Sequence, residues 1–309
     1  MPRILFVKTS SLGDVVHQCP AVSDAARSLP GAKIDWVVEE PFAGIARMHS
    51  QVSEVVPVAV RRWRRALWTR EVWRELVEFR RRIAAQAYDA VIDTQGLLKS
   101  ALITCFTSGT RHGFDRESAR EPFASRFYDR THAVPRDLHA VERNRRLTAA
   151  ALGFSLEERI DYGLRPGGEP TRKLPAAYSV LLTMTSRADK LWPEARWIEL
   201  GRALALPVVL PWGSEKERAR AERIGQGVGQ AIVPQRMSIE ALADVLRNAR
   251  NVVGLDSGLT HLAAALGTAT IGIFCGSDPA LTGLHAPKAM NVGAVGRSPQ
   301  VAEVLELAR

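Results

Sequence analysis

Short apolar runs alternate with longer segments of helical period along this chain, and the alternation limits the possible folds more than any other sequence feature. In the first half, the apolar runs predict strands at residues 4–7, 33–38, 54–58 and 90–93. The segments between them predict helices at residues 15–29 and 42–49, a helix of about 20 residues ending before Tyr88, and a helix from Leu97. Strands that alternate with helices form parallel sheets, because each return to the same edge requires a crossover. The sequence therefore predicts an α/β fold whose ligands bind at the carboxyl ends of the strands.

The same alternation resumes after residues 165–175, a stretch with three prolines and two adjacent glycines that predicts a linker. Beyond it we predict strands at residues 178–183, 207–210, 232–233, 252–255 and 269–274, and helices at 194–204, 215–225, 238–248 and 259–266. At 309 residues the chain exceeds what one hydrophobic core usually organises. We therefore predict two domains, residues 1–164 and 176–296, with a ligand cleft between them, and a C-terminal helix within residues 297–309 that packs back on the first domain.

The composition excludes several classes of protein. Hydrophobic residues make up 46% of the chain and the mean hydropathy is −0.08, which excludes a disordered chain and a polytopic membrane protein. The cysteines, Cys19, Cys105 and Cys275, have no disulfide or zinc-site spacing. The N-terminus holds only four consecutive apolar residues, and the apolar stretch 259–275 is interrupted by His261. We expect a cytosolic protein with no secretion signal, membrane span or metal site.

Positive charge is concentrated in one block. The chain has 42 basic and 33 acidic residues, a formal charge of +9, and residues 61–82 alone carry nine arginines against three glutamates. This excess is too one-sided for the ordinary pairing of a solvated helix face, so it predicts an anionic partner. Because Trp68 and Trp73 lie in the same block, both nucleic acid and an acidic lipid headgroup fit it.

The chain has no dinucleotide fingerprint, Walker motif, zinc-protease motif or nucleophile elbow, which argues against dehydrogenases and P-loop ATPases. A different motif, residues 8–14, follows the first predicted strand and ends in Asp14 at the start of a helix, whose dipole keeps a carboxylate ionised. Asp14 is therefore a candidate general base, although aspartate is also a common helix cap. His17 is a weaker candidate for the same role.

A second motif, residues 256–261, occupies the corresponding place in the second half. The backbone N–H groups at this helix start, with Gly258, suit a pyrophosphate. Asp256 would bind sugar hydroxyls and His261 would reach a phosphate; the alternative is an ordinary helix cap beside a partly buried histidine. A Gly-Ser-Asp-Pro turn at residues 276–279, after the next strand, favours the ligand site.

Two further strand ends carry candidate ligand contacts. Lys190 lies between the first strand and the first helix of the second half, where a lysine either contacts a phosphate or lies in solvent. Trp212 and Glu217 follow the next strand. Trp212 is either an aromatic wall of the ligand site or a core residue. Glu217 offers a carboxylate that suits the hydroxyl pair of a ribose.

Eight sequence motifs recur here in the order found in a known family. They are residues 8–14, 35–40, 58–64, 88–93, 95–97, 119–122, 210–213 and 256–261. Together they span nearly the whole chain, which resembles the heptosyltransferase I branch of glycosyltransferase family 9, the lipopolysaccharide heptosyltransferases. The resemblance implies a GT-B fold: two facing Rossmann-like domains with parallel sheets and an interdomain cleft.

The resemblance also implies a reaction. Members of the branch transfer L-glycero-D-manno-heptose from ADP-heptose to the first Kdo of Kdo2-lipid A, with inversion at the anomeric carbon and without an essential metal or other cofactor. They work in lipopolysaccharide inner-core synthesis at the cytoplasmic face of the bacterial inner membrane. We therefore expect peripheral contact with an anionic membrane surface, no nucleic-acid partner and a monomeric chain.

Residue by residue, the resemblance implies three groups of site residues. Asp14 matches the catalytic base. The donor-binding positions are Thr185, Ser186, Lys190, Glu217, Met237, Asp256, Ser257, Gly258, Leu259, Thr260 and His261, with Ser186 standing where the family has threonine. The acceptor-binding positions are Ser10, Ser11, Gly13, Arg61, Arg62, Arg64, Arg65 and Arg120.

Two other functions stay open on the sequence alone. One is a related transferase, either heptosyltransferase II or an enzyme that uses another nucleotide sugar. The other is a nucleic-acid-binding protein that would use the arginines of residues 61–82, although no recognition motif accompanies them.

Overall fold

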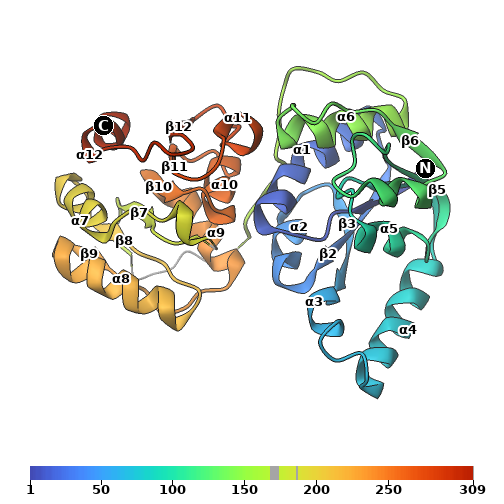
Figure 1. Cartoon of the computed structure of the whole chain (residues 1–309), viewed down its shortest axis with the longest axis horizontal. Coiled ribbons are helices and arrows are strands. Elements are labelled where there is room, and N and C mark those ends of the chain that lie inside the picture. Colours follow the sequence, from blue (N-terminus) through green and yellow to red (C-terminus); the bar gives the residue numbers. More distant parts are fainter. Residues whose placement is uncertain (168–173, 186, 309) are drawn as a thin grey trace. The chain divides into compact units, whose positions relative to one another are not determined.

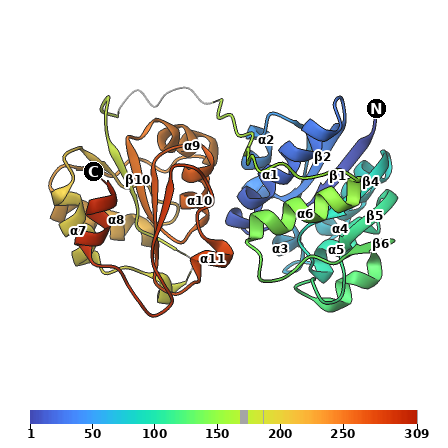
Figure 2. The same cartoon turned by 90° about the horizontal axis from the view of Figure 1, so that it is seen from above.

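The computed structural model describes residues 1–167, 174–185 and 187–308, and contacts divide the chain into two compact units, Met1–Leu164 and Arg165–Arg309 (Figure 1). Residues 168–173 of the predicted linker, together with Ser186 and Arg309, lie outside the described residues. In each unit, helices cover both faces of a six-stranded sheet (Figure 2). The predicted α/β fold is confirmed.

The sheet of the first unit is entirely parallel. Its strands are β1 (Arg3–Val7), β2 (Lys33–Glu39), β3 (Val52–Val58), β4 (Ala87–Asp93), β5 (Ser108–Phe114) and β6 (Arg130–His132). They lie in the order β3-β2-β1-β4-β5-β6, and every neighbouring pair is parallel. Strands β2 and β3 are added on one side of β1, whereas β4, β5 and β6 are added on the other side. The boundary between β1 and β4 is therefore the switch point of the sheet.

Two sets of helices cover this sheet. One face carries α1 (Leu12–Ser28), α2 (Ala43–Met48) and α6 (Ala140–Leu152), and the other carries α3 (Val60–Trp63), α4 (Arg70–Ala84) and α5 (Leu98–Thr104). Short 3-10 helices occur at η1 (Glu40–Phe42) and η2 (Pro122–Phe127). Leu5 and Val7 of β1 pack against the α4 side, and because side chains alternate along a strand, the buried Ile4 and Phe6 face α1.

The second unit repeats this topology. Its strands are β7 (Ser179–Leu182), β8 (Val208–Val209), β9 (Ala231–Ile232), β10 (Asn251–Leu255), β11 (Thr270–Phe274) and β12 (Ala289–Gly293). Its helices are η3 (Ala188–Lys190), α7 (Glu194–Ala203), α8 (Glu215–Val228), α9 (Ile239–Asn248), α10 (Gly258–Ala265), α11 (Pro279–Thr282) and α12 (Val301–Ala308). The strand order β12-β11-β10-β7-β8-β9 is that of the first sheet, with β7 and β10 in the places of β1 and β4.

Every predicted strand is present, but the sequence does not predict β5, β6, β12 or α6. Strand β5 contains two glycines and little apolar sequence, which hides it from pattern reasoning. Gly113 in this strand has a packing reason, because a Cβ there would lie 2.2 Å from the ring of Tyr128. Helix α6 buries Asn144 and Arg145, so polar residues stand where an apolar period would reveal a helix.

The helix predicted before Tyr88 is confirmed as α4, although it is shorter than predicted at 15 residues, and a break at residues 64–69 separates it from the short helix α3, which was not predicted. Thr69 stabilises the break: its Oγ1 donates to Ala66 O (2.9 Å) and accepts from Val72 N (3.4 Å). The threonine thus caps the start of α4.

The C-terminal helix packs on the second unit. Val301 and Val304 of α12 are buried in the same cluster as Trp192 and Trp197, and Trp192 Nε1 donates to Pro299 O at 3.1 Å. The prediction that the segment 297–309 packs on the first domain is therefore wrong, because these apolar side chains complete the second core.

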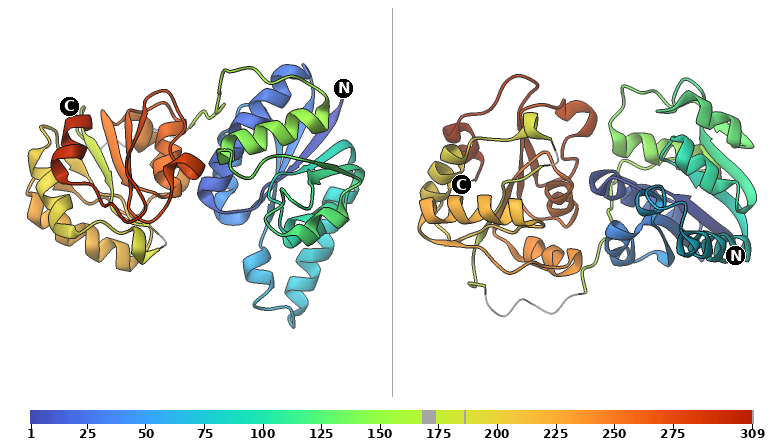
Figure 3. Two further views of the ribbon diagram at one scale, coloured as in Figure 1. Left: turned by 45° about the horizontal axis from the view of Figure 1, so that its top comes forward. Right: turned by 60° about the horizontal axis from the view of Figure 1, so that its bottom comes forward.

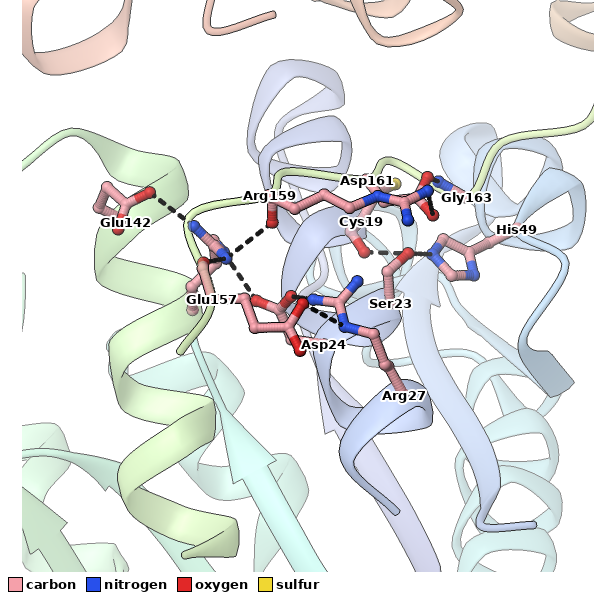
Figure 4. A network of polar contacts seen from close by, with 11 residues as sticks. Cys19, Ser23, Asp24, Arg27, His49, Glu142, Glu157, Arg159, Asp161 and Gly163 are labelled. Atoms are coloured by element: carbon pink, nitrogen blue, oxygen red, sulfur yellow. Dashed lines mark hydrogen bonds and ion pairs between the residues drawn. The ribbon is translucent and has the colours of Figure 1, made fainter. Parts of the chain in front are cut away.

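A buried ion pair joins α6 to α1 near the end of the first unit (Figure 4). Arg145 Nε donates to Asp24 Oδ2 at 2.7 Å. Its Nη2 donates to the backbone oxygens of Glu157 and Arg159, at 2.6 and 3.1 Å. The segment that leads out of the first unit is thereby fixed to both helices.

His49 forms an isolated antiparallel bridge with Leu164 of the same segment, and its side chain binds α1 (Figure 4). Its Nε2 lies 3.1 Å from both Ser23 Oγ and Cys19 O. Burial lowers the pKa of His49 to about 4, and the hydrogen bond to Cys19 O and the charge of Asp161 oppose the shift. The imidazole is therefore neutral at physiological pH.

Acid is expected to destabilise the chain through His49. The unfolded chain takes up a proton there near pH 6.5 but the folded chain only near pH 4, so the free energy of unfolding falls as the pH drops through this window. The loss attributable to His49 is up to about 3 kcal/mol. Urea unfolding at neutral pH and near pH 4.5 should show a smaller acid loss in His49→Gln than in the wild type. The half-exposed His285→Gln serves as control, and an unchanged pH dependence in His49→Gln would contradict the prediction.

Candidate functional site

Each predicted loop motif follows a central strand of its sheet, but the prediction that the two occupy corresponding places is wrong, because β1 corresponds to β7 and β10 corresponds to β4. Residues 8–14 follow β1, and residues 94–97 follow its neighbour β4. In the second unit, residues 183–190 follow β7 and residues 256–261 follow β10. Both pairs of loops flank a switch point, which is where doubly wound sheets bind ligands.

In the first unit, the buried side chain of Gln95 holds the loop that precedes Asp14. Its Oε1 accepts bonds from the backbone N–H groups of Thr9 (3.1 Å) and Ser10 (3.2 Å). Gln95 is held in turn by Asp93, which accepts from its backbone N–H at 2.8 Å. The loop after β4 therefore fixes the loop after β1.

Asp93 organises the end of β4 from a fully buried position. Its Oδ1 also accepts from Gly96 N (3.3 Å) and its Oδ2 from the Tyr128 hydroxyl (2.8 Å). Burial raises the pKa of Asp93, although these donors oppose the shift. Gly96 has a φ of +65°, a left-handed conformation that favours glycine at this turn.

Asp14 is the third residue of α1, and its carboxylate turns back to the helix start. Its Oδ2 accepts from the backbone N–H (2.8 Å) and the Oγ (3.2 Å) of Ser11, and Arg120 Nη1 lies 4.0 Å away. The side chain is 29% exposed, and its Oδ1 makes no hydrogen bond with any described residue. Asp14 thus caps the helix with one oxygen and leaves the other for a ligand. His17 is buried and packs edge-on against His139.

Two lysines add positive charge to this loop. Lys8 is buried, and its Nζ donates to Thr94 O (2.7 Å) and Asn144 Oδ1 (3.3 Å). Burial lowers the pKa of Lys8 to about 8, against the attraction of Asp14 and Asp93. Lys99 Nζ of α5 donates to Ser10 Oγ at 2.9 Å. With Arg120 close by, these cations favour an anionic ligand at this edge.

The arginines implied for the acceptor differ in their surroundings. Arg62 forms ion pairs with Glu40 (3.1 Å) and Glu75 (2.8 Å), so its charge is already compensated. Arg61, Arg64 and Arg65 are exposed and form no ion pair with the described residues. Sequence reasoning could not separate Arg62 from the others, because the charge count does not show which arginines are paired.

Asp256 is the centre of the site in the second unit. Its Oδ2 accepts from Lys190 Nζ and Ser277 Oγ, and its Oδ1 lies 3.3 Å from His261 Nε2. Thr185 Oγ1 donates to the backbone oxygen of Asp256 at 3.1 Å. One residue thus joins the loops that follow β7, β10 and β11.

The carboxylate of Asp256 is strongly stabilised as an anion. Burial alone would raise its pKa, but the hydrogen bonds from His261, Lys190 and Ser277 together hold the pKa well below its usual range. Both oxygens therefore already have donors. In this structure Asp256 orients Lys190 and His261, which differs from the prediction that it is free for sugar hydroxyls.

The start of α10 offers free N–H groups beside this cluster. Ser257 is the cap residue, and its backbone oxygen accepts from Thr260 N (3.1 Å) and His261 N (3.2 Å). The N–H groups of Gly258 and Leu259 bond to none of the described residues. Such a helix start attracts anions.

The other predicted donor contacts lie around β8 and β9. Glu217 Oε2 accepts from Gly213 N at 2.7 Å near the start of α8. Trp212 Nε1 donates to Pro234 O at 2.7 Å, which links the loops after the two strands. Met237 is half-buried just before α9. Ser186 lies outside the described residues.

Sequence reasoning placed Lys8, Gln95 and Ser277 within its motifs but assigned them no role, and it missed Lys99. Lys8, Gln95 and Ser277 stand in loops that directly follow predicted strands, so their position was a usable signal. The partners of their side chains were not readable from the sequence.

Within the described residues, no group of three or more His, Cys, Asp and Glu side chains is arranged for a metal ion. No helix in that part of the chain has the length and apolar character for crossing a membrane.

Comparisons with known proteins agree with this geometry. Residues 76–306 match the model of glycosyltransferase family 9 (heptosyltransferase). A lipopolysaccharide heptosyltransferase 1 of Pseudomonas aeruginosa is 47% identical over 94% of this chain and 83% of its own length. The E. coli heptosyltransferase WaaC solved with ADP has a TM-score of 0.92 and 43% identity, covering 99% of this chain and 98% of that chain. The structure of WaaC with ADP-2-deoxy-2-fluoro heptose has a TM-score of 0.88 and 42% identity over the same shares.

Asp256→Asn is expected to destabilise the second unit, because it removes the charged acceptor shared by Lys190, Ser277 and His261. Breaking one partner of such a buried pair costs about 3 kcal/mol of unfolding free energy. Chemical denaturation measures the loss. Asp189→Asn is the matched control, because Asp189 pairs with Arg187 at an exposed site where the loss should be small. Equal stability of the two variants would contradict the central role of Asp256.

Proposed function

The chain belongs to glycosyltransferase family 9, the heptosyltransferases, and we propose that it transfers L-glycero-D-manno-heptose from ADP-heptose to the first Kdo of Kdo2-lipid A. The observation that carries the proposal is the likeness, over nearly the whole of both chains, to a heptosyltransferase solved with ADP and with a fluorinated ADP-heptose. The relative from Pseudomonas, a lipopolysaccharide heptosyltransferase 1, supports a lipopolysaccharide acceptor. The Kdo2-lipid A acceptor is what the family resemblance of the sequence motifs implies.

The second unit provides what a nucleoside diphosphate sugar requires. In this proposal the pyrophosphate binds the N–H groups of Gly258 and Leu259, with Lys190 and His261 beside it. Asp256 orients both side chains. Lys190 and the helix start then stabilise the charge that develops on the leaving ADP, so the proposed reaction needs no metal ion.

The remaining donor contacts are assigned by their place in the fold. Glu217 would bind the ribose hydroxyls and Met237 would pack near the adenine, since both follow strands of the second sheet at its ligand-binding edge. Thr185 and Ser186 lie after β7 and would contact the phosphates. Ser257 and Thr260 hold the start of α10 through their hydroxyl groups, 3.1 Å apart.

Asp14 is the proposed general base. Its Oδ1 takes the proton of the Kdo hydroxyl as that oxygen forms a bond to the anomeric carbon of heptose. The bond from this carbon to ADP breaks, and its electron pair leaves with the phosphate. One displacement inverts the anomeric carbon, so no covalent intermediate with the protein forms.

The first unit is the proposed acceptor site. Ser10, Ser11 and Gly13 line the loop that carries Asp14, and Arg120 would bind the acid groups of the acceptor beside it. Arg61, Arg64 and Arg65 extend this charge along α3 and the turn after it. Arg62 would contact the acceptor only if its ion pair with Glu40 or with Glu75 were broken. In this proposal the enzyme acts as a monomer at the cytoplasmic face of the inner membrane.

Asp14→Asn keeps the cap but removes the base, so kcat should fall by about 10²–10⁴-fold. The Kd for ADP-heptose, measured by calorimetry, should stay within about twofold of wild type because the donor binds the second unit. Asp89→Asn is the control: this carboxylate accepts from Arg3 N near the opposite end of β4 and should leave turnover unchanged. Near-normal kcat in Asp14→Asn would remove Asp14 from the role of base.

The acceptor is tested separately with wild-type enzyme. Heptose transfer to Kdo2-lipid A is the expected result. Transfer only to a core that already carries heptose would instead support a heptosyltransferase II activity, and transfer from another nucleotide sugar in a donor panel would change the assigned donor.

A further inference from the structure

One face of the first unit gathers exposed apolar side chains. Among the described residues, most of the large hydrophobic side chains that are exposed lie on it: Leu67, Trp68, Trp73, Val77, Leu98, Leu102, Phe106 and Phe123. They belong to α4 and the turn before it, to α5 and the turn after it, and to η2. Helices α3 and α4 extend beyond the sheet of this unit (Figures 1 and 3). We call this set the apolar face.

The apolar face is continuous across its helices. Phe79 of α4 and Ile103 of α5 pack in one cluster beneath it, and the Arg80 guanidinium lies 5.8 Å from the ring centroid of Phe106 on its outer side. Ala101 of α5 packs with Ala124 of η2. Leu98 and Leu102 stand four residues apart, so they form one stripe along α5, and Phe106 lies in the turn after its end.

The tryptophans are held in exposed positions. Trp68 is 81% exposed and Trp73 is 58% exposed. Trp73 Nε1 donates to Leu67 O at 2.8 Å, which folds the turn against α4. A monomeric protein in water gains nothing by exposing indole rings, whereas at a lipid headgroup boundary the ring is stable with one end apolar and the other polar.

Positive charge surrounds the apolar face. The arginines that border it are exposed and form no ion pair with the described residues; they are Arg64, Arg65, Arg70, Arg74, Arg80 and Arg81. On α4, Glu71 and Glu78 are the exposed carboxylates that offset them. Apolar side chains bordered by uncompensated arginines match a bilayer with anionic headgroups. Nucleic acid fits less well, because the aliphatic stripe on α5 cannot stack on bases.

The apolar face also adjoins the candidate acceptor site. Lys99 on α5 follows Leu98 directly and donates to Ser10 Oγ at 2.9 Å. Arg120, 4.0 Å from Asp14, comes just before η2, which carries Phe123. An acceptor embedded in a bilayer at this face would therefore present its sugar close to Asp14.

We propose that the apolar face docks the enzyme on an anionic lipid bilayer, with Trp68 and Trp73 at headgroup level and the α5 stripe against the interface. The proposal rests on the proposed function in one respect, since it uses a membrane-borne acceptor. It adds which surface meets the membrane, and it places α5 and η2 in the contact as well as the arginine block.

Binding is tested by co-flotation with vesicles of phosphatidylcholine, either pure or with about one third phosphatidylglycerol. Wild type should float with the anionic vesicles at least about tenfold more than with the neutral ones. Trp68→Ser/Trp73→Ser and Leu102→Ser/Phe106→Ser should each lose at least about fivefold of this binding. Leu281→Ser/Val295→Ser, which removes exposed apolar side chains of the second unit, is the matched control and should bind like wild type.

Activity separates this inference from the proposed function. With a deacylated, water-soluble acceptor all variants should turn over like wild type, and with Kdo2-lipid A in anionic vesicles the two face variants should be at least about fivefold slower. Wild type without turnover on either acceptor would refute the proposed function alone. Face variants that float like wild type, or a wild type that binds duplex DNA and no vesicles, would refute the docking face. Trp68→Ser alone keeps the test valid if loss of the Trp73 bond disturbs the turn.

Discussion

The parallel pairing of the two central strands in each sheet is the constraint on which the rest of the structure depends. Because β1 and β4 run in the same direction, as do β7 and β10, both members of each pair end at the same edge. The loops that follow have no strand partner for their backbone groups, so side chains must satisfy them. In the first unit, the Gln95 side chain accepts hydrogen bonds from the loop after β1. In the second unit, Asp256 accepts hydrogen bonds from Thr185 and Lys190 in the loop after β7. Both candidate sites therefore arise from the same topological feature.

Much of the fold was predictable because buried parallel strands are short apolar runs, which stand out between helices. The misses have physical causes. Strand β5 pairs through its backbone while glycine makes room for Tyr128, and α6 turns Asn144 and Arg145 inward to bond with other elements. Strand β5 and helix α6 both depend on partners that are distant in sequence, so a local sequence pattern does not predict them.

The candidate sites were predictable in position and only partly in chemistry. Asp14 and Asp256 are visible as polar residues at the ends of apolar runs. That Asp14 keeps one oxygen free while Asp256 has both occupied depends on Ser11, Lys190 and Ser277, whose contacts exist only in the folded chain. Arg62 shows the same limit, because its two glutamate partners come from different elements. The sequence therefore shows where charged residues lie along the chain. The fold determines which of them are unpaired and can bind a ligand.

Helix α1 links two features that are far apart in the first unit. Its first turn carries Asp14, and further along the same helix Ser23 and Asp24 bind His49 and Arg145, which fasten the segment leading out of the unit. One element therefore carries the candidate base and also holds the departing chain, although Pro20 interrupts its backbone hydrogen bonds between the two ends.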